Sequence, residues 1–74
     1  MPAWKRMVRK RLKKRTRGRC FYCDKRLDTN WTIDHLIPIS RGGTSRKSNL
    51  APSCRRCNEE KGNMTHIEYF QGLS

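Results

Sequence analysis

The pattern of apolar and polar residues predicts a helix within residues 1–19. Trp4, Met7, Val8 and Leu12 recur close to the spacing that places side chains on one face of an α-helix. A frayed tail is the alternative, because the positions between them are densely cationic and like charges oppose helix formation. The two alternatives are compatible if the segment becomes ordered on binding phosphates, which relieve the repulsion.

A β-hairpin is expected in the middle of the chain. Residues 31–36 alternate large apolar and polar side chains and include β-branched members, which is typical of a short strand. A polar, glycine-rich loop follows at residues 40–48, and residues 49–52 return as a second, antiparallel strand. Strand alternation places Asp34 and His35 on opposite faces. Both can therefore reach one site only if the strand ends or bulges there.

Two short helices are expected after the hairpin. Ser53 is the candidate N-cap of the first, which runs to Gly62, a residue suited to the position after a helix end. Thr65 and Glu68 have the spacing of a capping box and predict the second. The elements together predict a small α+β fold. We expect a basic nucleic-acid-binding segment, a central core, and a short C-terminal helix or tail, at residues 1–19, 20–63 and 64–74 respectively.

The four cysteines form two pairs with the same internal spacing, Cys20-x-x-Cys23 and Cys54-x-x-Cys57. Two disulfides would require an oxidising compartment, and residues 1–4 lead into basic residues rather than into the apolar core of a signal peptide. A structural Zn²⁺ site in a reducing cytoplasm fits better, because Zn²⁺ binds four thiolates tetrahedrally. Phe21 and Tyr22, between the first two thiolates, are expected to shield the metal. A chain of 74 residues has a small interior and needs such a constraint.

The charge balance indicates a polyanionic partner. The formal net charge is +12, from 18 Lys and Arg against 6 Asp and Glu. Residues 1–19 hold much of this excess and contain no acidic residue. Nucleic acid is the natural partner for such a segment. No apolar run approaches the ~20 residues of a membrane span, so we expect a soluble protein with no membrane contact.

Polar residues with a specific spacing occupy the centre of the chain. Asp34-His35 is followed after fourteen positions by Asn49, and Asn49 after nine positions by Asn58, which directly follows the last cysteine. With the two cysteine pairs and Lys61-Gly62, this pattern resembles the HNH endonuclease family from Cys20 to about Asn63. The resemblance implies a ββα-metal core, in which a β-hairpin and a helix grip one divalent metal ion.

The resemblance also implies a role for each motif residue. His35 would be the general base that activates water, because a histidine side chain can accept a proton near neutral pH. Asp34 and Asn58 would bind the catalytic ion, and Asn49 would hold the hairpin loop and the histidine by hydrogen bonds. Lys61 would contact the scissile phosphate. Asparagine rather than histidine at position 58 favours Mg²⁺ or Mn²⁺ over softer metals.

Two functions from different classes are compatible with these observations. The first is an HNH-type DNA endonuclease that nicks one strand, in the cytoplasm of a bacterial or phage-infected cell. Its small size is similar to that of stand-alone phage HNH proteins, and only that analogy suggests phage packaging proteins as partners. The second is a non-catalytic zinc-knuckle module that binds nucleic acid. His66, Trp4 and Trp31 lie outside the motif, and we expect them to be packing or surface residues.

Overall fold

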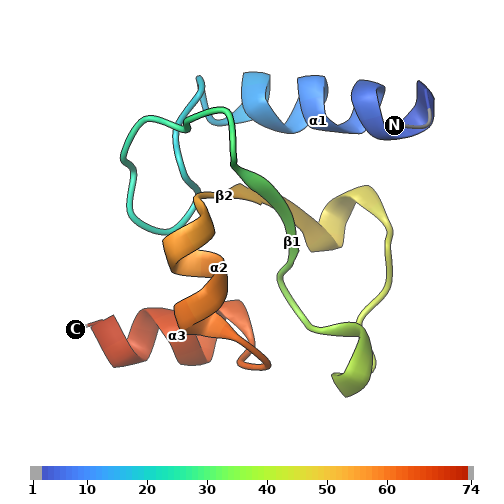
Figure 1. The fold of residues 1–74 in the computed structure, drawn as a ribbon. Coiled ribbons are helices and arrows are strands. Elements are labelled where there is room, and N and C mark those ends of the chain that lie inside the picture. Colours follow the sequence, from blue (N-terminus) through green and yellow to red (C-terminus); the bar gives the residue numbers. More distant parts are fainter. Residues whose placement is uncertain (1–2, 74) are drawn as a thin grey trace.

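The computed structural model describes residues 3–73, and the side chains of residues 5–72 within that range. A small α+β fold is confirmed, with a helix at the basic N-terminus (Figure 1). The helices and strands, in chain order, are α1 (Ala3–Arg15), β1 (Thr32–His35), the 3-10 turns η1 (Ile39–Arg41) and η2 (Lys47–Asn49), β2 (Leu50–Ser53), α2 (Arg55–Lys61) and α3 (His66–Leu73). The Trp4 side chain, expected to pack, lies outside the described side chains.

The two strands form an antiparallel hairpin with a regular register. Asp34 is opposite Ala51, and His35, the last residue of β1, is opposite Leu50. Asn49 belongs to η2, so the second strand begins one residue later than the sequence predicts. Since His35 is the last residue of β1, this strand ends at the Asp34-His35 pair, as a shared site requires.

Helix α1 packs against the hairpin and contributes to the core, which excludes the frayed tail for the described part of this segment. Its Leu12 is 2% exposed and belongs to the same apolar cluster as Trp31 and Leu50. The Arg9 guanidinium lies 3.9 Å from the centroid of the Trp31 ring and donates a hydrogen bond to the Trp31 carbonyl oxygen at 3.1 Å. Trp31 is thus a packing residue, as expected. Helix α2 packs against β1, and Figure 1 shows α1 and α2 on opposite sides of the hairpin.

The helix ends follow the sequence expectations with one correction. Ser53 is not the N-cap of α2, because it is the last, fully buried residue of β2. Cys54 occupies the cap instead, and its sulfur accepts a hydrogen bond from the Cys57 N–H at 3.4 Å. At the other end Gly62 has a φ of 51° and donates its N–H to the Asn58 carbonyl oxygen, as predicted.

The capping box of α3 is confirmed. The Glu68 N–H donates to Thr65 Oγ1 at 3.2 Å, and the Thr65 N–H donates to Glu68 Oε1 at 2.9 Å. Within residues 3–73, no helix has both the length and the apolar character that crossing a membrane would require.

Candidate active site and metal centre

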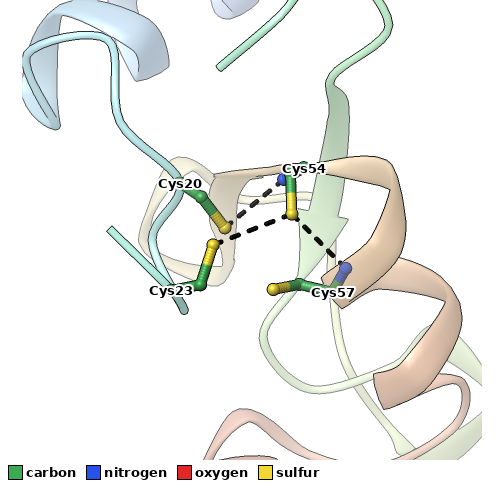
Figure 2. Close-up of side chains that lie close together, drawn as sticks. All are labelled: Cys20, Cys23, Cys54 and Cys57. Carbon is green, nitrogen blue, oxygen red and sulfur yellow. Dashed lines mark hydrogen bonds between the residues drawn. The ribbon is translucent and has the colours of Figure 1, made fainter. Parts of the chain in front are cut away.

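The four cysteine sulfurs converge on one point between the loop after α1 and the start of α2 (Figure 2). All four Sγ atoms lie within 4.8 Å of one another, and the cysteines are unbridged. Four sulfurs placed tetrahedrally at ~2.3 Å from a zinc ion are ~3.8 Å apart. The Cys23 and Cys54 sulfurs are 3.8 Å apart, so the donor set fits such an ion in both type and spacing.

Backbone N–H groups favour the charged form of Cys20, whereas burial raises the pKa of Cys23 and of Cys57. Burial by itself would raise the pKa of Cys20, but hydrogen bonds from the backbone at Cys23, Cys54 and Tyr22 outweigh it and lower that pKa to about 7. The Cys54 N–H, for example, donates to Cys20 Sγ at 3.4 Å. A thiolate is the form of cysteine that binds metals. The type, spacing and unbridged state of the four sulfurs therefore fit a bound metal ion.

Asp34 lies on the α2 side of the hairpin, within a buried polar network. Its Oδ1 accepts a hydrogen bond from Asn58 Nδ2 at 2.9 Å. Its Oδ2 is 3.2 Å from Lys61 Nζ and also accepts a hydrogen bond from the hydroxyl of Tyr22. Two of the predicted motif residues, one from β1 and one from α2, are thus in direct contact.

Lys61, which we expected to contact the scissile phosphate, is largely buried and lines the same cavity as Asp34 and Asn58. The residue is only 2% exposed, and its Nζ donates to the His35 carbonyl oxygen at 2.9 Å in addition to its contact with Asp34. The Lys61 ammonium therefore contacts both the Asp34 carboxylate and the His35 backbone.

The His35 side chain points to the other face of the hairpin. Its ring is half-buried, and Nε2 lies 3.2 Å from the Ser45 hydroxyl of the hairpin loop. Strand alternation holds here without a bulge, so Asp34 and His35 diverge at the end of β1. The two side chains therefore lie on opposite faces of the hairpin at the end of β1.

The amide of Asn49 fastens the hairpin loop to the backbone just beyond His35. Its Oδ1 accepts from the Ile37 N–H at 2.9 Å, while Nδ2 donates to the carbonyl oxygens of Ile37 and Thr44 at 2.9 and 2.7 Å. Gly43 completes the loop, because a Cβ at this position would lie 1.7 Å from the Ile37 carbonyl oxygen. The loop approaches the strand end so closely that a side chain at position 43 does not fit.

Two cavities meet at the end of β1 and share Ile33 and His35. One, of about 280 Å³, lies on the α2 side, and its lining includes Asp34, Asn58 and Lys61. The other, of about 420 Å³, lies between α1 and the hairpin. It combines an apolar floor with basic residues and has no acidic residue in its lining, which includes Lys5, Val8, Arg9, Lys47 and Leu50.

Phe21 and Tyr22, which we expected to shield the metal together, have different surroundings in the structure. Phe21 remains 39% exposed beside the cysteine cluster, whereas the neighbouring Tyr22 is 7% exposed and reaches Asp34. Burial raises the pKa of Tyr22, as does its hydrogen bond to Asp34, so its hydroxyl stays a donor at neutral pH.

His66 packs as expected, with Nδ1 3.3 Å from the Leu36 carbonyl oxygen.

Comparisons with known proteins agree with the fold and identify its family. A family model described as HNH endonuclease matches residues 20–64, more than half of the chain. The CRISPR-associated endonuclease Cas9 of Corynebacterium diphtheriae is 39% identical over 46 residues, which are 60% of this chain and 4% of that protein. The crystal structure of the Type II-C Cas9 enzyme from Actinomyces naeslundii superposes with a TM-score of 0.81 at 27% identity, covering 92% of this chain and 7% of that one. The chain thus spans only a small part of the length of either relative.

Proposed function

Because the chain belongs to the HNH endonuclease family, we propose that it is a divalent-metal-dependent DNA endonuclease that hydrolyses one phosphodiester bond at a time. A single observation carries the proposal. Asp34 and Asn58 are in contact on one face of the hairpin end, while the ring of His35 stands on the other. In phosphodiester hydrolysis the attacking and leaving oxygens lie roughly in line, on opposite sides of the phosphorus. A phosphate at the strand end would meet a different group on each side.

His35 is the proposed general base. It takes a proton from the attacking water at its imidazole nitrogen, and a positioned base of this kind contributes about 10²- to 10⁴-fold to the rate. The Ser45 hydroxyl beside Nε2 holds the ring in orientation. Asn49 acts indirectly, by fixing the loop that carries Ser45 to the backbone of Ile37.

Asp34 and Asn58 are the proposed ligands of the catalytic ion. One carboxylate and one amide suit Mg²⁺ or Mn²⁺, which bind hard oxygens and keep several positions for water and phosphate. A bound ion would supply positive charge to the 3′ oxygen as it leaves, giving 5′-phosphate and 3′-hydroxyl ends. We propose that Lys61 supports this site from the interior, by holding Asp34 and the end of β1 together.

The cysteine cluster is proposed to hold a structural Zn²⁺. Cys54 and Cys57 lie at the start of α2, and Asn58 is the next residue along that helix. An ion bound to these thiolates and to Cys20 and Cys23 would fix α2 against the loop after α1, and so fix Asn58 against Asp34. Unbridged thiols that bind zinc suit the reducing cytoplasm, which we propose as the location.

DNA is the proposed partner, bound through its phosphates. Helix α1 carries basic residues on its outer surface. Two further basic residues of this helix, Lys5 and Arg9, line the cavity that also contains His35. Its volume of about 420 Å³ lies within the range of small-molecule binding sites, roughly 300–1,000 Å³. Its apolar floor and cationic rim match the sugars and phosphates of a strand that passes over the end of the hairpin. None of the three comparisons supports a phage packaging partner, and we do not propose one.

The second candidate, a non-catalytic nucleic-acid-binding module, is favoured by one observation, the charge of +12. A nicking assay separates the two. Wild-type protein should nick supercoiled plasmid with Mg²⁺ or Mn²⁺, and His35→Ala should lose roughly 100-fold or more of that activity while keeping its DNA affinity.

His66→Gln is the matched control, because His66 is the other histidine and packs against Leu36 away from the Asp34-Asn58 pair. It should cleave like the wild type. Equal activity in His35→Ala and wild type would show that the binding module is the correct interpretation.

A further inference from the structure

Tyr22 connects the cysteine cluster to the carboxylate of the proposed catalytic site. It lies between Cys20 and Cys23 in the chain, and its backbone N–H donates a hydrogen bond to Cys20 Sγ at 3.4 Å. Its side chain extends in the other direction, and the hydroxyl donates to Asp34 Oδ2. Tyr22 therefore makes one hydrogen bond to the cysteine cluster and one to the carboxylate of the proposed catalytic site.

The Tyr22 ring has little freedom to move. It is 7% exposed and meets Tyr69 edge to face, with ring centroids 5.3 Å apart and an interplanar angle of 81°. Phe21 packs edge to face against it at 5.1 Å, and Phe70 at 5.4 Å with a tilt of 47°. The hydroxyl is therefore held at a fixed position by aromatic packing and not only by its hydrogen bond.

The two oxygens of Asp34 have different surroundings as a result. Oδ2 faces the interior, where it accepts from Tyr22 and contacts Lys61 Nζ at 3.2 Å. Oδ1 faces Asn58, at 2.9 Å from its Nδ2. Only Oδ1 thus lies beside the second proposed ligand.

We propose that Tyr22 is a positioning residue, which holds Asp34 Oδ2 in the interior so that Oδ1 is presented with Asn58 to a divalent cation. This inference rests on the proposed function, because it assigns a part to Tyr22 in that metal site. Groups that orient a ligand from behind typically change metal affinity or activity by roughly 10- to 100-fold when they are removed. The zinc cluster and the catalytic ion are then coupled, since the loop that binds one orients the ligand of the other.

Tyr22→Phe tests the inference, because it removes the hydroxyl and keeps the ring. The full zinc-loaded chain is titrated with Mn²⁺ by calorimetry in the absence of DNA, and zinc content and melting temperature are measured on the same samples. Mn²⁺ should bind roughly 10- to 100-fold more weakly, with zinc content unchanged. A tyrosine that is merely structural would lower the melting temperature without changing the Mn²⁺ dissociation constant of the folded protein.

Tyr69→Phe is the matched control. Tyr69 is 4% exposed and packs against Tyr22, but its hydroxyl donates to Glu60 Oε2 at 2.8 Å rather than to Asp34. It should bind Mn²⁺ like the wild type. Replacing Tyr22 by 4-aminophenylalanine keeps a donor at the same position and should restore the affinity that Tyr22→Phe loses.

Each outcome separates the inference from the function on which it rests. Wild-type Mn²⁺ affinity in Tyr22→Phe, or weakened affinity in the folded 4-aminophenylalanine protein, overturns the role of Tyr22 alone. Absence of plasmid nicking by a wild-type protein that binds Mn²⁺ overturns the proposed function, while the affinities still decide the role of Tyr22. Absence of Mn²⁺ binding by the wild type overturns both.

Discussion

Lys61 Nζ lies 3.2 Å from Asp34 Oδ2 in an ion pair whose side chains are 1% and 6% exposed. Breaking a buried pair by removing one partner leaves an uncompensated charge, at a cost of about 3–5 kcal/mol. We therefore expect Lys61→Met to lower the free energy of unfolding by about 3 kcal/mol or more, as measured by urea denaturation.

Arg55→Met is the control for this pair. Arg55 is on the same helix and lies 3.6 Å from Glu59, but these side chains are 72% and 71% exposed, and exposed pairs contribute little. Similar losses of stability in the two variants would mean that burial gives the Lys61 pair no special weight.

The outer surface of α1 should set the salt dependence of DNA binding. Lys10, Arg11 and Lys14 are exposed, and the triple change of these residues to glutamine should leave the fold intact. The slope of log affinity against log salt should become shallower by about 0.9 for each phosphate of duplex DNA that the helix no longer neutralises. Fluorescence anisotropy at several salt concentrations measures it.

Three exposed cations away from α1, Lys25, Arg55 and Arg56, provide the matched triple. Their change to glutamine removes the same charge and should alter the slope less. If the two triples gave the same slope, net charge rather than α1 would determine binding. Deleting α1 is a poorer test, because Leu12 is part of the core.

Gly43→Ala should destabilise the hairpin loop. The added Cβ would lie 1.7 Å from the Ile37 carbonyl oxygen, so the backbone must move, and overpacking of this kind costs about 1–3 kcal/mol. Gly72→Ala is the control, because a Cβ there meets no atom within 4 Å. Thermal unfolding should show a lower melting temperature for Gly43→Ala only. An unchanged value for that variant would mean that the loop adapts easily.

Cys54→Ser should separate helix capping from metal binding. Serine is itself a preferred N-cap, so the start of α2 can still be capped through a side-chain oxygen. One of the four thiolates is lost, however, and the binding of a structural zinc ion is coupled to folding. We expect lower zinc content by elemental analysis and a large loss of stability, and a chelator should destabilise the wild type in the same way. A zinc-free variant that stayed folded and nicked DNA would contradict the structural role of zinc.

Much of this site could be predicted from the sequence because its information is local. The spacing of Cys20, Cys23, Cys54 and Cys57 predicts a metal cluster, since two short Cys-x-x-Cys segments present thiolates in pairs. The alternation of β1 correctly places Asp34 and His35 on opposite faces, and the strand end removes the need for a bulge. Capping-box spacing likewise locates the start of α3.

The remainder depends on packing between distant segments. The spacing from Asn58 to Lys61 places both on one face of α2, but the direction of a long lysine side chain depends on which acceptors are buried nearby, here Asp34 and the His35 carbonyl oxygen. The contact between Tyr22 and Asp34 joins residues twelve positions apart, and no periodicity relates them. Ser53 was a good cap by residue type, but the pairing of β2 extends through it.

The two faces of helix α1 have different roles: one holds the helix on the fold and the other carries its exposed charge. Its inner face, with Arg9 over the Trp31 ring and Leu12 in the core, fixes the helix to the hairpin. Its outer face carries cations such as Lys10 and Lys14, whose side chains are exposed. Charge can therefore be added or removed on the outer face as a design variable, to adjust how long the protein stays on the DNA that we propose as its partner, without repacking its interior.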